Sequence, residues 1–125
     1  MHFLWICLGG GIGTGARYLI GAWAIDRLGT SFPYGTIIVN FTGCFLMAAL
    51  VHAVAVTSAL SPEWRAALTV GFLGGFTTYS SFNQETVQLL ASGSAGLALG
   101  NVAVTLFGGF AMAWLGLLAA RQLLG

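Results

Sequence analysis

Gly74–Glu85, "GGFTTYSSFNQE", is the most polar stretch of a chain that is otherwise strongly apolar. It directly follows the apolar run "ALTVGFL", so it lies in the middle of a hydrophobic segment and not in a loop. Unpaired hydroxyl, amide and carboxyl groups cost several kcal/mol each in hydrocarbon. The stretch therefore predicts that these groups face other polar groups or water inside a membrane protein.

The composition of the whole chain indicates that lipid is its main solvent. Of 125 residues, 58% are hydrophobic and 6% are charged, whereas an average soluble domain is about 25% charged. The net charge is +1, and the four arginines are scattered, so no basic patch for nucleic acid is expected. Cys7 and Cys44 lie in apolar runs without the spacing of metal ligands and are expected to be free thiols.

Four apolar segments are each long enough to cross the membrane, since about 20 helical residues span a ~30 Å hydrocarbon core. Their connections are short, so consecutive helices are expected to be antiparallel neighbours. The start "MHF" has no lysine or arginine, which favours a permanent first span over a cleaved signal peptide. We predict an all-α membrane protein with one transmembrane domain, residues 1–125, and spans at about 2–25, 34–58, 62–90 and 96–124.

The arginines specify the orientation of the chain only weakly. With the N-terminus in the cytoplasm, Arg65 and Arg121 lie inside and Arg27 lies outside, while Arg17 belongs to a span. Orientation follows the excess of lysine and arginine in cytoplasmic loops, and two against one is a small excess. The sequence therefore permits insertion in both orientations, and hence an antiparallel dimer of identical chains.

Each segment carries small or polar residues spaced three to four apart, which places them on one helix face. Glycines on such a face let helices approach, and Asn or Thr can bond across the interface. Close packing accounts for the glycines, but a polar path also accounts for the recurring amides and hydroxyls. The stripes are Gly10, Gly13, Arg17 and Gly21; Thr36, Asn40, Gly43 and Met47; Thr78, Ser81 and Glu85; and Asn101, Thr105, Gly108 or Gly109, and Met112.

The charges within the spans favour an anion path. Arg17 costs roughly 3 kcal/mol or more in a span and marks a pathway or a paired site, unless it reaches a headgroup or water. Glu85 is the one acid expected at depth, because Asp26 and Glu63 belong to loops. A small cation exporter would carry an acid early in the chain. Arginine, hydrogen-bond donors and electropositive aromatic edges instead suit a small anion.

These features together resemble the Fluc (CrcB) family of fluoride channels over the whole chain. The resemblance is carried by "GARY" (15–18), "YGTIIVNFTG" (34–43) and "GFLGGFTTYSSFNQE" (71–85), of which the last is the most specific. It implies a passive, fluoride-selective channel, not an enzyme, that exports fluoride across the plasma or inner membrane of a prokaryote. It also implies an antiparallel, dual-topology homodimer with two pores and a third helix broken near its middle.

The resemblance assigns roles to individual residues. A single structural Na⁺ at the dimer centre would be held by the backbone carbonyls of Gly74 and Thr77. Arg17 would lie near the aqueous vestibule. Tyr79 stands where the family more often has phenylalanine, and its hydroxyl needs a partner. The implied fluoride pore comprises Asn40, Tyr79, Ser80, Ser81, Phe82, Asn83 and Glu85, with Asn101 and Thr105 as candidates from the fourth segment.

Two other functions remain open from the sequence. A small proton-coupled exporter would use Glu85 to exchange protons for its cargo. A subunit that transports nothing would use the small-residue stripes only for assembly.

Overall fold

The computed structural model describes residues 1–125, and the expected all-α fold is confirmed. Proline occurs only where helices begin: Pro33 precedes α2, and Pro62 opens α3, where a missing N–H costs nothing. Two stretches, η1 and η2, have the wider π-helical turn. The elements are α1 (His2–Leu28), α2 (Tyr34–Val56), α3 (Pro62–Ala66), η1 (Ala67–Leu73), α4 (Gly74–Phe76), α5 (Ser80–Ala91), α6 (Ala95–Ala103), η2 (Val104–Gly108) and α7 (Gly109–Leu124).

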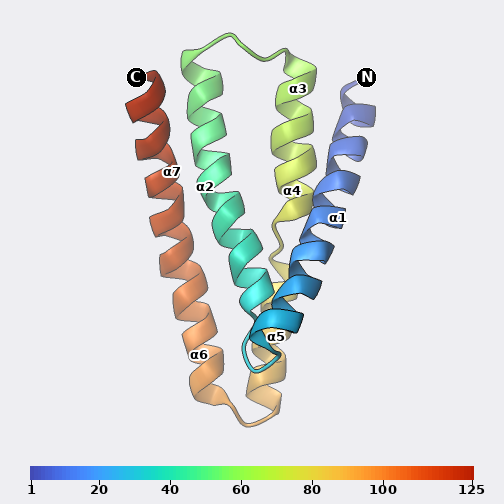
Figure 1. Ribbon diagram of the computed structural model, residues 1–125, viewed down its shortest axis with the longest axis vertical. Helices are drawn as coiled ribbons and strands as arrows, with labels where there is room; N and C mark the ends of the chain where they lie inside the picture. The colour runs from blue at the N-terminus through green and yellow to red at the C-terminus, as the bar shows by residue number, and fades with distance from the viewer.

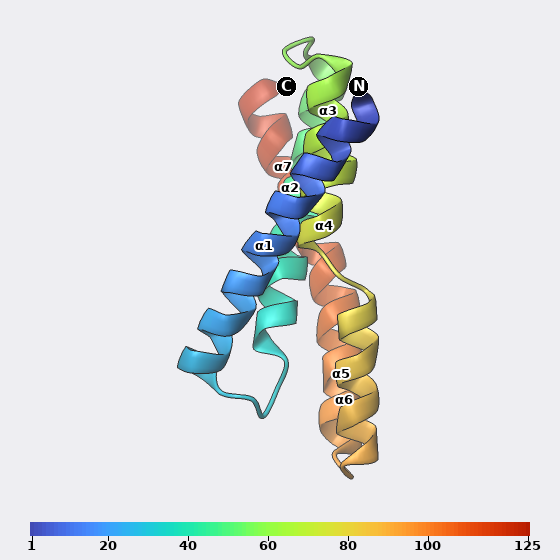
Figure 2. The same ribbon diagram turned by 90° about the vertical axis from the view of Figure 1, so that its right-hand side faces the viewer.

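The elements form four long arms joined by short connections at alternate ends, so both termini lie at the same end (Figure 1). Glycines with positive φ, Gly29 and Gly93, terminate α1 and follow α5, a conformation that costs glycine little. Toward the other end, α1 and the start of α2 lean away from α5 and α6, so the molecule is forked there (Figure 2).

Three helical stretches are long and apolar enough to cross a membrane: His2–Leu28, Tyr34–Val56 and Ala95–Leu124. The third arm, from α3 to α5, is not among them because it is divided into shorter helices. Only 12 of the 125 residues are buried within the chain. Most large apolar side chains must therefore face lipid or another protein chain.

The third arm is non-helical from Thr77 to Tyr79, between α4 and α5. Thr77 is extended, with φ −85° and ψ 159°, and α5 continues on an axis displaced from that of α4 (Figure 2). Local sequence favours this: two glycines weaken α4, and threonine side chains compete for backbone groups. The hydroxyl of Thr77 donates to the Leu73 carbonyl, while that of Thr78 accepts from the Ser81 N–H as a helix cap does.

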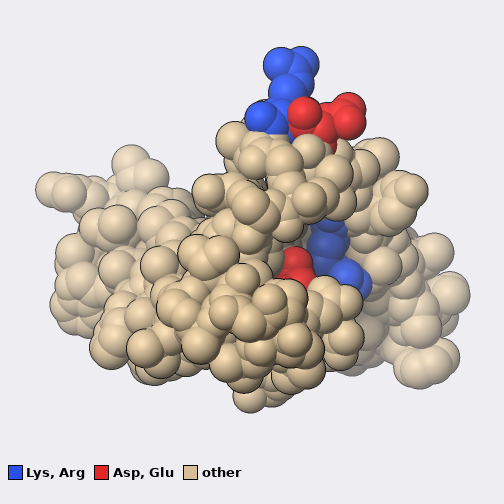
Figure 3. All heavy atoms as spheres, turned by 90° about the horizontal axis from the view of Figure 1, so that it is seen from below, with Lys and Arg blue, Asp and Glu red and all other residues tan.

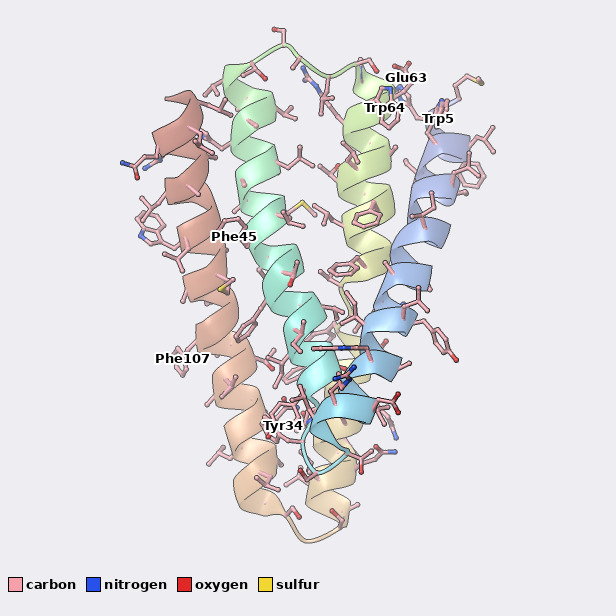
Figure 4. The ribbon with its side chains drawn as sticks, viewed as in Figure 1. Trp5, Tyr34, Phe45, Glu63, Trp64 and Phe107 are labelled. Atoms are coloured by element: carbon pink, nitrogen blue, oxygen red, sulfur yellow. The ribbon has the colours of Figure 1, made fainter.

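The arms pack as two pairs, α1 against η1 and α4, and α2 against α7. Glycines bring their backbones together: a Cβ on Gly13 would overlap the Phe72 carbonyl, and one on Gly116 would overlap that of Phe45. At the end that carries the termini, the rings of Trp5 and Trp64 stack with centroids 6.0 Å apart (Figure 4). The contacts at Gly13 and Trp5 hold α1 to the third arm, and the contact at Gly116 holds α7 to α2.

We predict that Gly13→Ala lowers the free energy of unfolding by about 1–3 kcal/mol, the usual cost of overpacking, because α1 must move away from Phe72. Gly15→Ala is the matched control, since a Cβ there meets nothing within 4 Å. The measurement is unfolding of the detergent-purified protein followed by circular dichroism. Equal unfolding curves for the two variants would show that the close approach at Gly13 is not needed.

Candidate polar groove

A groove of about 780 Å³ lies beside the non-helical segment of the third arm. Its walls come from α2, from the junction of α4 and α5, and from the fourth arm, α6 to α7. It brings together several residues that the sequence singled out, although they are far apart in the chain. These residues are Asn40, Gly74, Thr77, Tyr79, Phe82 and Thr105.

Asn40 of α2 is bonded twice to the backbone of Thr78. The Thr78 N–H donates to its Oδ1 at 2.8 Å, and its Nδ2 donates to the Thr78 carbonyl at 2.9 Å. The side-chain amide thus replaces the helical partners of a residue that has left the helix, at a depth where water is scarce. An amide nitrogen has two N–H groups, so one of them remains free to donate to a ligand.

Arg17 of α1 binds the other side of the same segment. Its Nε donates to the Gly75 carbonyl at 3.0 Å, next to a long contact from the Thr14 hydroxyl at 3.5 Å. The carbonyls at the end of a helix carry partial negative charge, which a guanidinium stabilises. Arg17 is half-buried and tied to the third arm, so it does not reach freely to a headgroup.

Two aromatic side chains line the groove from the start of α5. The ring centroids of Tyr79 and Phe82 are 6.0 Å apart and their planes are tilted by 50°. Tyr79 is 74% exposed in the single chain, and its hydroxyl makes no hydrogen bond there. The rings of both residues are therefore accessible to a ligand or to a second chain.

Glu85 lies in a different pocket, of about 390 Å³, between α5 and the α1–α2 connection. The Thr36 hydroxyl donates to its Oε1 at 2.5 Å. Viewed toward this forked end, one acidic and one basic group are recessed in the hollow (Figure 3). No arginine lies within ion-pair distance of Glu85, because the one ion pair of the chain joins His2 to Glu63 at the opposite end. The carboxyl is therefore held by a hydroxyl alone.

The other predicted residues lie outside the groove. Ser80 and Asn83 are exposed on α5 and line neither pocket. The Ser81 N–H donates to the Thr78 hydroxyl, which caps α5. Asn101 is 1% exposed, and its Nδ2 donates to the Thr86 hydroxyl at 2.9 Å. Asn101 thus lies behind the wall of the groove.

Sequence reasoning missed the parts played by Gly75, by the Thr78 backbone and by His52. The first two take part through backbone atoms, which a side-chain pattern does not reveal. His52 lines an extension of the groove, of about 1000 Å³, between α2 and α7, and its Nε2 is buried without a hydrogen-bond partner. A lone histidine in an apolar span was the available signal.

No three His, Cys, Asp or Glu side chains come together in the chain. A metal ion here would depend on carbonyl, hydroxyl or amide oxygens, which suit hard cations.

Four helical arms, with long apolar spans and a groove beside the break in the third arm, define a small multi-pass protein of the cell membrane. The family model described as "CrcB-like protein, Camphor Resistance (CrcB)" matches residues 4–117, and the chain belongs to this family. It is similar to proteins named fluoride-specific ion channel FluC. The protein of this name from Sorangium cellulosum is 46% identical to this chain, over 98% of this chain and 97% of its own length. Those of Anaeromyxobacter dehalogenans and Acidobacterium capsulatum are 44% and 41% identical, covering 99% and 98% of this chain and 98% of their own.

The expected family is thus confirmed. The relatives are named as ion channels, and ion channels are not enzymes.

We predict that Asn40→Ala lowers the free energy of unfolding by about 1–3 kcal/mol, the cost of leaving polar groups unpaired, because the Thr78 N–H and carbonyl lose their partners. Gln84→Ala removes an amide from an exposed site with no side-chain bond and should change the free energy of unfolding by less than about 0.5 kcal/mol. Denaturant titration of both variants in detergent measures the difference. Similar values for both would argue against a role for Asn40 in holding Thr78.

Proposed function

We propose that the protein is a passive, fluoride-selective channel of the cell membrane that lets the cell lose fluoride. The observation that carries the proposal is the amide of Asn40. It is fixed in place by Thr78, yet it has one N–H left for an anion in the groove that it lines. The names of the relatives, fluoride-specific ion channels, support the same conclusion.

Selectivity would come from replacing the water around fluoride with a few fixed donors. Fluoride is small and strongly hydrated, so the donors must be close, and each site must be weak enough to release the ion. The Asn40 amide, the ring edges of Phe82 and Tyr79 and the hydroxyl of Thr105 are the donors along the groove. No carboxylate lines it, and Glu85 lies in a separate pocket. An anion in the groove therefore meets no carboxylate. Ser80, Ser81 and Asn83 do not line the groove of the single chain, and we propose them as a separate polar track along α5.

We extend the proposal to an antiparallel homodimer of dual topology. A groove of about 780 Å³ is far larger than a fluoride ion or a water molecule, whose share of the liquid is ~30 Å³. A second copy would cover the apolar part of the lining and leave narrow paths along the polar part. The small arginine excess, which permits both orientations, is compatible with this arrangement.

A structural Na⁺ between the two copies would be held by the carbonyls of Gly74 and Thr77. In a regular helix these carbonyls accept from the N–H groups four residues on, those of Thr78 and Ser81. Here the Thr78 N–H donates to Asn40 and the Ser81 N–H to the Thr78 hydroxyl. Both carbonyls have lost their helical donors, and both residues belong to the lining of the groove, so four such oxygens from two chains would fit a hard cation. The ion would join the two non-helical segments without being transported.

A proton-coupled exporter that uses Glu85 is the alternative. Its half-buried position and its single hydroxyl partner, Thr36, would suit a carboxyl that takes up and releases a proton. This function predicts transport that collapses with the proton gradient and in Glu85→Gln.

We predict fluoride efflux, with little chloride efflux, from liposomes that hold the purified protein. Phe82→Ile should slow fluoride efflux by up to about tenfold, because the ring edge is lost; one favourable aromatic contact is worth ~0.5–1.5 kcal/mol. Phe107→Ile is the control, since Phe107 is 71% exposed and points away from the bundle (Figure 4). An ion-selective electrode records the efflux. No fluoride efflux from the wild-type protein, or equal passage of chloride, would refute the channel.

We also predict that replacing Na⁺ with a bulky organic cation lowers the free energy of unfolding by about 2–3 kcal/mol when Na⁺ is at ~100 times its Kd. Thr77→Val should keep this Na⁺ dependence, because the ligand is a carbonyl. Thermal unfolding and fluoride efflux are measured in matched buffers. Unchanged stability and efflux without Na⁺ would count against the cation site.

A further inference from the structure

A chain of hydrogen bonds behind the groove links its two walls. The Thr86 hydroxyl donates to the Phe82 carbonyl at 2.8 Å, Asn101 Nδ2 donates to the Thr86 hydroxyl at 2.9 Å, and the Thr105 hydroxyl donates to Asn101 Oδ1 at 3.4 Å. We call this chain of bonds, from Phe82 through Thr86 and Asn101 to Thr105, the relay. Its two end residues, Phe82 and Thr105, line the groove. Thr86 and Asn101, in its middle, do not.

The position of the relay lets it set the distance between the walls. Thr86 lies four residues after Phe82 on α5, and Asn101 lies four residues before Thr105 on the fourth arm. Each is thus one helical turn, about 5.4 Å, from a groove residue on its own helix. Asn101 is 1% exposed, so its amide has no water to replace these partners. Releasing it would leave a buried amide unpaired, which is costly in a membrane.

The relay also fixes the direction of its bonds. The Thr86 hydroxyl donates its proton to the Phe82 carbonyl, so its oxygen is left to accept from the amide nitrogen of Asn101. The amide oxygen is then turned toward Thr105. The contact of 3.4 Å is long for an O–H···O bond, so the Thr105 proton can turn to an anion in the groove at little cost.

We propose that Asn101 is a positioning residue for ion selectivity, acting through Thr86 on Phe82 and through its own amide oxygen on Thr105. It sets the spacing of the two walls without touching the ion, and its long contact leaves the Thr105 proton free to turn to an anion. This inference rests on the proposed fluoride channel.

The test uses Thr86, which does not line the groove and so cannot act on the ion directly. Thr86→Val keeps the shape but removes both bonds of the hydroxyl, whereas Thr86→Ser keeps the hydroxyl. Thr69→Val is the matched control, because the Thr69 hydroxyl makes the same kind of bond, to the Arg65 carbonyl at 2.7 Å, outside the relay. Asn101→Leu and the double variant Asn101→Leu, Thr86→Val complete the set. Fluoride and chloride efflux from liposomes are recorded for each.

We expect Thr86→Val and Asn101→Leu each to lower fluoride efflux about three- to tenfold, the range for one lost hydrogen bond in a membrane, and to lower the ratio of fluoride to chloride. The double variant should be no worse than the poorer single variant, and Thr86→Ser and Thr69→Val should match wild type. Wild-type efflux and selectivity in Thr86→Val, or additive losses in the double variant, would overturn the proposal. If Asn101→Leu does not fold, the comparison of Thr86→Val with Thr86→Ser still tests the proposal.

A wild-type protein without fluoride efflux would refute the channel itself. If the wild-type protein conducts fluoride and Thr86→Val has the same efflux and selectivity, only the role of the relay would be refuted.

Discussion

The double hydrogen bond between Asn40 and Thr78 is the interaction on which the rest of the site depends. It satisfies a backbone unit that has left the helix, in a region where an unpaired N–H or carbonyl costs several kcal/mol. By taking the Thr78 N–H, it also deprives the Gly74 carbonyl of its helical donor. Arg17 secures the other side of the break through Gly75. Residues of two spans thus hold a third in a conformation that its own hydrogen bonds cannot maintain.

The membrane explains why so thin a bundle suffices. A soluble protein with 12 buried residues out of 125 would lack a core, but lipid solvates the exposed apolar side chains at no cost. Tight contact is confined to the glycine crossings, such as those at Gly13 and Gly116. These crossings hold each pair of arms together, and the groove lies between α2, the fourth arm and the break in the third arm.

Polar groups in the spans fall into three kinds according to what they contact. Asn40 and Arg17 bind backbone and keep the third arm open at Thr77–Tyr79. Glu85 pairs with Thr36 in a pocket at the forked end. Asn101 is enclosed with Thr86 and lines neither the groove nor the pocket of Glu85. The same type of side chain, an asparagine amide, therefore lines the groove at Asn40 and lies behind its wall at Asn101. Only the surrounding residues distinguish these two positions.

The sequence by itself determined the membrane class, the all-α fold and the family. It could do so because composition, segment length and the motif around Gly74–Glu85 are local properties of the chain. It also singled out Asn40 and Thr105, since polar groups in an apolar span need partners, and Phe82 through the resemblance to the family. Only the tertiary structure decided which partners they have. Hydrogen bonds from Asn40 to the Thr78 backbone, from Arg17 to Gly75 and from Asn101 to Thr86 join residues 15 to 58 positions apart, and no helical periodicity encodes such pairings. These pairings depend on how close the arms approach one another, and the glycine crossings set those distances.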